Sequence, residues 1–128
     1  MKLFLKLLIL VVALTVLSAW TFRLEMDTIY RGADASNMIE EFKAYGLNQT
    51  TMIVVGIFKV MCAIFLLLGL KYENFVTPAA FIMGAFMLAA IYFHLSISDP
   101  LIPTAPSAMM FLSCVLIIYL DKKISKSP

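Results

Sequence analysis

Four long apolar runs determine which architectures this chain can adopt. They cover about residues 3–22, 52–70, 75–96 and 104–120. Each is close to the roughly 20 residues that a helix needs to cross ~30 Å of hydrocarbon. A backbone in lipid must satisfy its own hydrogen bonds, so each run is predicted to be helical. We therefore predict an all-α membrane protein, a four-transmembrane-helix bundle that forms a single domain over residues 1–128.

The composition agrees with a membrane domain. Hydrophobic residues make up 62% of the chain and charged residues 14%, whereas soluble domains average roughly 45–50% and about 25%. Segments of ~10 residues with alternating hydrophobicity, which would indicate a membrane β-barrel, do not occur in the sequence.

The first apolar run also resembles a secretory signal, because Lys2 and Lys6 stand at its start. A signal would end in a cleavage site with small residues at alternate positions. The segment 17–19, Leu-Ser-Ala, fits this pattern poorly because Leu17 is bulky. The run also has the length of a membrane span, so we predict an uncleaved first helix.

The charged residues predict an orientation. Lysine and arginine near span ends favour the cytoplasm; Lys2 and Lys6 stand at the first span, and three lysines follow the fourth. The long first loop, 23–51, carries three basic and five acidic residues. We predict a multi-pass protein of the cytoplasmic (inner) membrane with both termini in the cytoplasm.

The first loop contains a short amphipathic segment. Asp34 and Ser36 are candidate helix caps, and Gly46 is a stop signal. Met38, Phe42 and Tyr45 recur at helical spacing, which predicts a short amphipathic helix at the interface. We favour a plain interfacial helix; the alternative is a helix that packs over the mouth of the bundle. Trp20, Phe22 and Tyr30 are expected to be aromatic anchors there.

Lys59 is the exception in the apolar pattern, since it lies inside the second run, roughly 12 Å from its outer end. A charge at the bilayer centre costs ~2.5–3.5 kcal/mol. Gly56, Lys59 and Ala63 share one helical face, and small residues allow another helix to approach closely. Lys59 is therefore expected to face the bundle interior. The structural alternative is that it snorkels to the interface or pairs with Glu25, Asp27 or Asp99.

The third run offers a matching face. The loop between the second and third runs is short, so these helices are antiparallel neighbours and Lys59 lies opposite about Met87. Helical side chains lean toward their own N-terminus, so Lys59 and His94 lean toward each other. Water or the polar head of a ligand would fit between them. The alternative for His94 is a solvated or capping histidine near the interface.

Cys62 and Cys114 are both near mid-span and form no C-x-x-C or metal-like pattern, so we interpret them as packing residues. The single histidine excludes bis-histidine haem ligation. No metal site and no catalytic residue are predicted.

The chain contains the stretch "VGIFKVMCAIFLLLGL", a short loop, the stretch "PAAFIMGAFMLAAIYFHLSISDP" and a final span. This arrangement resembles the DoxX-like family of small four-helix membrane proteins. The resemblance covers about residues 53–120. Its motif positions here are Gly56, Lys59, Gly69, Pro78, Ala79, Ala90, His94 and Asp99. The family often has glutamate where Lys59 stands and a basic residue where Arg23 stands, so a Glu–Lys pair does not carry over.

The resemblance implies several functions, because some members look like membrane subunits of quinone-linked sulfur oxidation or of oxidative-stress complexes. A eukaryotic branch assists receptor assembly, and many members have no assigned activity. The first hypothesis is an accessory or ligand-binding subunit that binds a quinone or a lipid, with candidate ligand-binding residues Lys59, His94, Met87 and Asp99.

The alternative is an assembly factor or interaction subunit without chemistry of its own. The sequence contains no flavin, haem or iron–sulfur motif, so electrons would have to come from a redox protein partner. Whether the chain is itself an enzyme stays open. A homo-oligomer is a further option, membrane lipid is an expected partner, and no nucleic-acid partner is expected.

Overall fold

The computed structural model describes residues 2–21, 37–96 and 101–125. Four helices in it are long and apolar enough to cross a membrane. They are α1 (Lys2–Ala19), α3 (Gln49–Leu68), α4 (Val76–Ser96) and α5 (Leu101–Ser125). The predicted fold class, an all-α membrane bundle with four spans, is confirmed.

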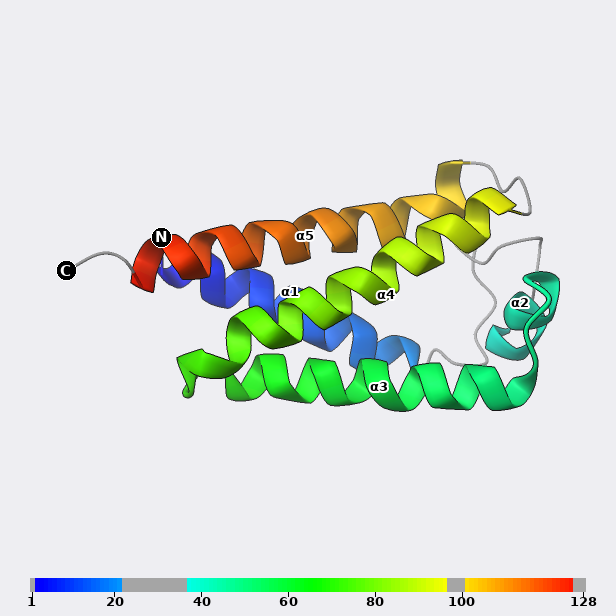
Figure 1. Cartoon of the computed structure of the whole chain (residues 1–128), viewed down its shortest axis with the longest axis horizontal. Coiled ribbons are helices and arrows are strands. Elements are labelled where there is room, and N and C mark those ends of the chain that lie inside the picture. The colour runs from blue at the N-terminus through cyan, green and yellow to red at the C-terminus, as the bar shows by residue number, and fades with distance from the viewer. Residues whose placement is uncertain (1, 22–36, 97–100, 126–128) are drawn as a thin grey trace.

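The four spans are arranged as two pairs. The pair α1 and α3 and the pair α4 and α5 each pack extensively, and the contacts of α3 with α4 and of α1 with α5 join the pairs. Figure 1 shows α3 and α4 close together at their connecting turn and farther apart toward the opposite end of the bundle. Both chain ends lie at the turn end, which we call the termini end.

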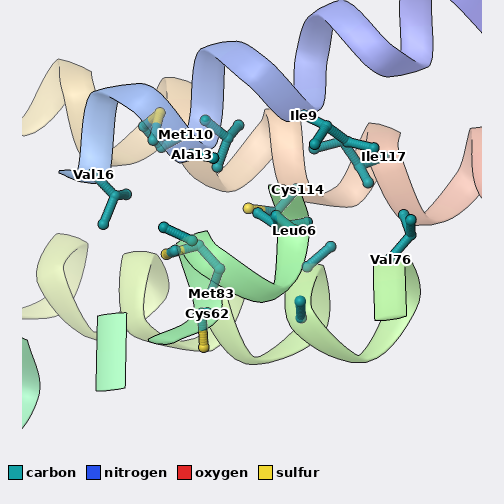
Figure 2. Close-up of a cluster of buried hydrophobic side chains, with 14 of the residues drawn as sticks. Ile9, Ala13, Val16, Cys62, Leu66, Val76, Met83, Met110, Cys114 and Ile117 are labelled. Carbon is teal, nitrogen blue, oxygen red and sulfur yellow. The ribbon is translucent and has the colours of Figure 1, made fainter. Parts of the chain in front are cut away.

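The core is built by all four spans. It contains small and medium apolar side chains, with Ile9, Leu66, Met83 and Ile117 almost completely buried. Figure 2 shows these side chains pointing toward one another from α1, α3, α4 and α5. Cys62 and Cys114 are buried in the same cluster, as the sequence predicted. At the termini end, the hydroxyl of Thr77 donates to Asp121 Oδ2 over 2.6 Å and ties α4 to α5.

The tight connection of α3 to α4 depends on close packing at Gly69. This residue ends α3, and the short 3-10 helix η2 (Glu73–Phe75) leads into α4. A β-carbon on Gly69 would stand 2.6 Å from Val76 Cγ2 and 3.0 Å from the Leu66 carbonyl oxygen. The absence of a side chain therefore lets the turn fold back and makes the two helices antiparallel neighbours.

The remaining α-helix, α2 (Met38–Ala44), is short and does not span the bundle. It lies opposite the termini end, and we call its end of the bundle the α2 end. Its N-cap is Asn37, whose side-chain oxygen accepts from the Glu40 N–H over 2.9 Å. The predicted caps Asp34 and Ser36 lie outside the described residues, as do the proposed anchors Phe22 and Tyr30. Gly46, with φ +80°, follows the helix as predicted; this left-handed conformation favours glycine.

The short helix predicted in the first loop is present as α2, and its contacts are those of the alternative interpretation, a helix that packs over the mouth of the bundle. Met38 and Phe42 are buried and pack with Met52 of α3 in a second apolar cluster, which Trp20 and Val55 extend. Burying this apolar face against the bundle removes it from water and lipid headgroups alike. The helix therefore packs on the mouth of the bundle and places its polar side chains at that end.

The last apolar span begins at Thr104, as predicted, but the helix that contains it begins three residues earlier, at Leu101. Pro106 therefore lies inside α5. Proline is tolerated near a helix start because the first N–H groups have no intrahelical partner. The predicted run 104–120 therefore locates the apolar span and not the full helix.

The glycines give a stability prediction for the packing. Gly69→Ala should destabilise the protein by about 1–3 kcal/mol through overpacking, because its β-carbon would collide with Val76. Gly84→Ala is the matched control, since its β-carbon would stand 3.4 Å from Cys114 Cβ, an ordinary contact. Thermal unfolding in detergent should show a lowered midpoint for Gly69→Ala only, and equal midpoints would contradict this account of the turn.

Candidate functional site

A cavity of about 320 Å³ lies between the two helix pairs near the α2 end. All four spans and α2 contribute to its walls, which are mostly apolar. Ligand sites in proteins commonly measure about 300–1,000 Å³ and combine apolar walls with a few polar groups. The polar side chains in this wall are Thr15, Glu41, Tyr45, Lys59, His94 and Ser107. The cavity thus has the size and composition of a small ligand site.

Lys59 lies in the cavity wall, half-buried in the middle of α3. Its Nζ is 5.8 Å from the centroid of the Trp20 ring, a cation–π arrangement. Such contacts are worth about 0.5–2 kcal/mol, a substantial fraction of the ~2.5–3.5 kcal/mol that a charge costs at the bilayer centre. Glu41 lines the same cavity, and its carboxylate attracts the ammonium group. The prediction that Lys59 faces the bundle interior is confirmed.

Gly56 makes the Trp20 contact possible. A β-carbon at this position would stand 2.5 Å from Trp20 Cε3 and 2.6 Å from Cζ3. The indole therefore lies directly against the backbone of α3, one turn from Lys59. The predicted small-residue face admits an aromatic side chain from the end of α1.

His94 lies at the other side of the cavity, buried to 4% exposure. The Tyr45 hydroxyl is 3.3 Å from its Nδ1 and 3.2 Å from its Nε2. The same hydroxyl donates to Glu41 Oε1 over 2.9 Å, and Glu41 Oε1 is 4.0 Å from His94 Nε2. A hydroxyl has one proton to donate, so with that proton on Glu41 its oxygen accepts from a ring N–H of His94. The three side chains form a hydrogen-bonded chain at the cavity wall.

The predicted site residues fall partly in this cavity. Lys59, Met87 and His94 line it together. The rings of Phe58 and Phe86 stack with centroids 6.4 Å apart, which sets Lys59 and Met87 at the same level, as the register predicted. Asp99 lies outside the described residues, as do Glu25 and Asp27, the other acids considered as partners for Lys59.

Three further residues of the site were not predicted as such: Trp20, Glu41 and Tyr45. Glu41 and Tyr45 are four residues apart on α2, a spacing that puts them on one face of a helix. That spacing could have indicated a polar pair, but the docking of α2 on the bundle could not be read from it. Tyr45 occupies space beside His94 that the sequence analysis had assigned to water or a ligand head.

The site is equipped for hydrogen bonding and proton exchange. Lys59 supplies up to three donors and no acceptor, while the Tyr45 hydroxyl and the His94 ring can both give and take a proton. Within residues 2–21, 37–96 and 101–125, no three His, Cys, Asp or Glu side chains are grouped as metal ligands would be. The arrangement suits a ligand whose polar head accepts hydrogen bonds and whose remainder is apolar.

Substituting Gly56 tests the contact that fixes Trp20. Gly56→Ala should displace the indole from Lys59, because the new methyl carbon would overlap its ring; overpacking of this kind costs about 1–3 kcal/mol. Trp20 is the single tryptophan of the chain, so its fluorescence reports the change directly. We expect an altered emission spectrum for Gly56→Ala and an unaltered one for the control Gly84→Ala. An unaltered spectrum for both would contradict this packing.

Comparison with known proteins gives one match. The model of the DoxX-like family matches residues 7–117, most of the chain. No curated protein and no solved structure matches it. The matched range includes α2 and every described residue of the cavity wall. With its four membrane-spanning helices, the chain belongs to the DoxX-like family and is an integral membrane protein.

Proposed function

We propose that this protein is a ligand-binding accessory subunit that holds the polar head of a lipid-soluble molecule, a quinone being the first candidate. The observation that carries the proposal is the cavity itself, apolar over most of its wall and provided with Lys59 and His94 at the α2 end. A quinone has the matching chemistry, with carbonyl acceptors on a flat ring and an apolar tail. The resemblance of the family to quinone-linked subunits is in line with this choice.

In this proposal Lys59 donates a hydrogen bond to one carbonyl oxygen of the ligand. The apolar walls exclude water and make the bond stronger than the same bond in solvent. Met87 lies at the level of Lys59 and offers an adaptable apolar surface to the ring. The chain of His94, Tyr45 and Glu41 would exchange protons with the ligand at the α2 end, since each member can hold or pass a proton.

Quinone chemistry moves electrons as well as protons, so the proposal includes a redox-active membrane protein as partner. This chain would position the ligand and handle protons, and the partner would carry the electrons. The competing function, an assembly factor without a ligand, predicts that the charge of Lys59 can be removed without loss of function.

We further propose that both termini are cytoplasmic and that α2 faces the outside of the cytoplasmic membrane. Both chain ends lie at one end of the bundle. That end presents exposed lysines, Lys2 and Lys6 from α1 and Lys122 and Lys123 from α5. Basic residues next to short spans favour the cytoplasmic side, so the arrangement supports this orientation.

Replacing Lys59 tests ligand binding. Lys59→Met should weaken binding of decylubiquinone by about tenfold or more, because a hydrogen bond to a charged group contributes about 1.5–3 kcal/mol. Binding can be followed as quenching of Trp20 fluorescence in phosphatidylcholine nanodiscs, since Trp20 is part of the cavity wall and quinones quench indole emission. The thermal midpoint should stay unchanged or rise, because an apolar side chain replaces a desolvated charge.

Lys71→Met is the matched control for this variant. Lys71 is exposed near the termini end, where its ammonium lies over Tyr72, and its replacement should leave binding unchanged. Equal affinity of wild type and Lys59→Met, or quenching that never saturates in the wild type, would contradict the ligand-binding proposal. Unimpaired cellular function of Lys59→Met would favour the assembly factor.

The orientation can be tested with fusions. A fluorescent protein that folds only in the cytoplasm, attached after residue 128, should be bright, while a reporter that is active only outside the membrane should be inactive there. The positive charge at both chain ends is the physical reason. Activity of the external reporter would place the termini outside and reverse the assignment of the α2 end.

A further inference from the structure

The wall of the cavity between α3 and α4 is thin at one place. At the level of Lys59 the stacked rings of Phe58 and Phe86 close the space between the two helices. Three residues farther toward the α2 end on each helix stand Val55 and Ala89, and both line the cavity. The antiparallel register sets these two side chains at the same level of the bundle, and both are small compared with the phenylalanine rings that close the space next to them.

Ala89 also belongs to the outer surface of the bundle. It is exposed together with Ala85, Leu88 and Tyr92, which share its helical face and are spaced as one stripe along α4. This stripe faces lipid in a membrane-spanning helix. Ala89 therefore separates the cavity from the bilayer with a single methyl group. Beyond it, toward the α2 end, the rings of Tyr45 and Phe93 stack with centroids 5.5 Å apart.

The two aromatic pairs thus bracket a short segment of small side chains, which we call the seam: Val55 and Ala89 between Phe58–Phe86 and Tyr45–Phe93. The divergence of α3 and α4 away from their connecting turn, visible in Figure 1, widens the helix spacing toward this level. Small residues at a place where the helices diverge leave few side-chain atoms between the cavity and the surrounding lipid.

The α2 end of the cavity is closed in a different way. Met38 and Phe42 of α2 are buried against Met52, and Trp20 and Val55 pack on this cluster. The hydrogen bonds of Tyr45 with Glu41 and His94 hold α2 to α4. A ligand arriving from water on this side would have to displace a packed apolar cluster and break these bonds. At the seam Ala89 presents only a methyl group, so opening there requires rotamer changes of Val55 and of the neighbouring phenylalanines and no broken hydrogen bond between side chains.

We infer that the cavity is loaded laterally from the bilayer through the seam, and that its ligand is therefore a membrane-resident amphiphile. This inference rests on the proposed function. The ligand has one compact, hydrogen-bond-accepting head that reaches Lys59 and a flexible apolar tail that stays between α3 and α4 or in lipid. A molecule with polar groups at both ends would leave one of them in hydrocarbon, at a cost of several kcal/mol.

The experiment compares exchange rates of variants at the seam. Stopped-flow quenching of Trp20 by decylubiquinone, in phosphatidylcholine nanodiscs, gives association and dissociation rates of the full-length protein. Ala89→Phe should slow both association and dissociation by about tenfold or more, since a barrier on the route acts on both directions. Because Ala89 also lines the cavity, the slowed dissociation is the result that reports the route. Val55→Phe narrows the seam from the opposite helix and should act in the same direction.

Ala85→Phe is the matched control. It places the same side chain on the same exposed stripe, one turn away, at a residue that does not line the cavity, and it should leave both rates unchanged. If both Ala89→Phe and Val55→Phe exchange ligand as fast as wild type, the lateral route is wrong, but the proposed ligand site is not affected. Dissociation from these two variants that is as fast as wild type or faster, whatever the change in Kd, would also overturn the route. Quenching that does not saturate in the wild type would overturn the site itself.

Discussion

The ammonium group of Lys59, placed inside an apolar bundle, is the constraint on which the surrounding structure depends. Its cost at mid-membrane is a few kcal/mol, and the cation–π contact with Trp20, worth about 0.5–2 kcal/mol, does not offset all of it. The Trp20 ring approaches from α1 and the Glu41 carboxylate from α2. The first requires a glycine at position 56, and the second requires that α2 docks on the bundle. One charge thus ties together three helices that are distant in sequence.

The half of the bundle toward the termini end is more tightly packed than the half toward α2, since the cavity it holds measures about 160 Å³ against about 320 Å³. Near the termini end Leu66, Val76 and Ile117 are almost fully buried, and the Gly69 turn and the bond of Thr77 with Asp121 fasten the helices. Toward α2 the two helix pairs separate and leave the cavity. Close packing resists deformation, so the half toward the termini end can hold the register of α3 and α4 while the half toward α2 keeps the larger space.

The sequence predicts what depends on hydropathy and local geometry. The four spans follow from length and apolarity, and the level of Met87 opposite Lys59 follows from a short loop between antiparallel helices. The position of Glu41 beside His94 does not follow, because it depends on how α2 packs as a unit. Its apolar face, Met38 and Phe42, fits a membrane interface as well as it fits Met52. The start of the last span at residue 104 follows from hydropathy, whereas the start of α5 at Leu101 does not, because hydropathy locates the span and not the helix.

In the proposed function, α2 both covers the mouth of the bundle and supplies polar side chains to the ligand cavity. α2 buries Met38 and Phe42 over the mouth of the bundle, and from its other side it extends Glu41 and Tyr45 toward the cavity. If α2 moved away, water would reach Lys59, and the hydrogen bond that a ligand receives there would weaken toward its value in solvent. The bond of Tyr45 with His94 opposes that movement. In the proposed function, the affinity of Lys59 for a ligand head is therefore coupled to the docking of α2, and the proposed lateral route lets an amphiphile bind without disturbing that docking.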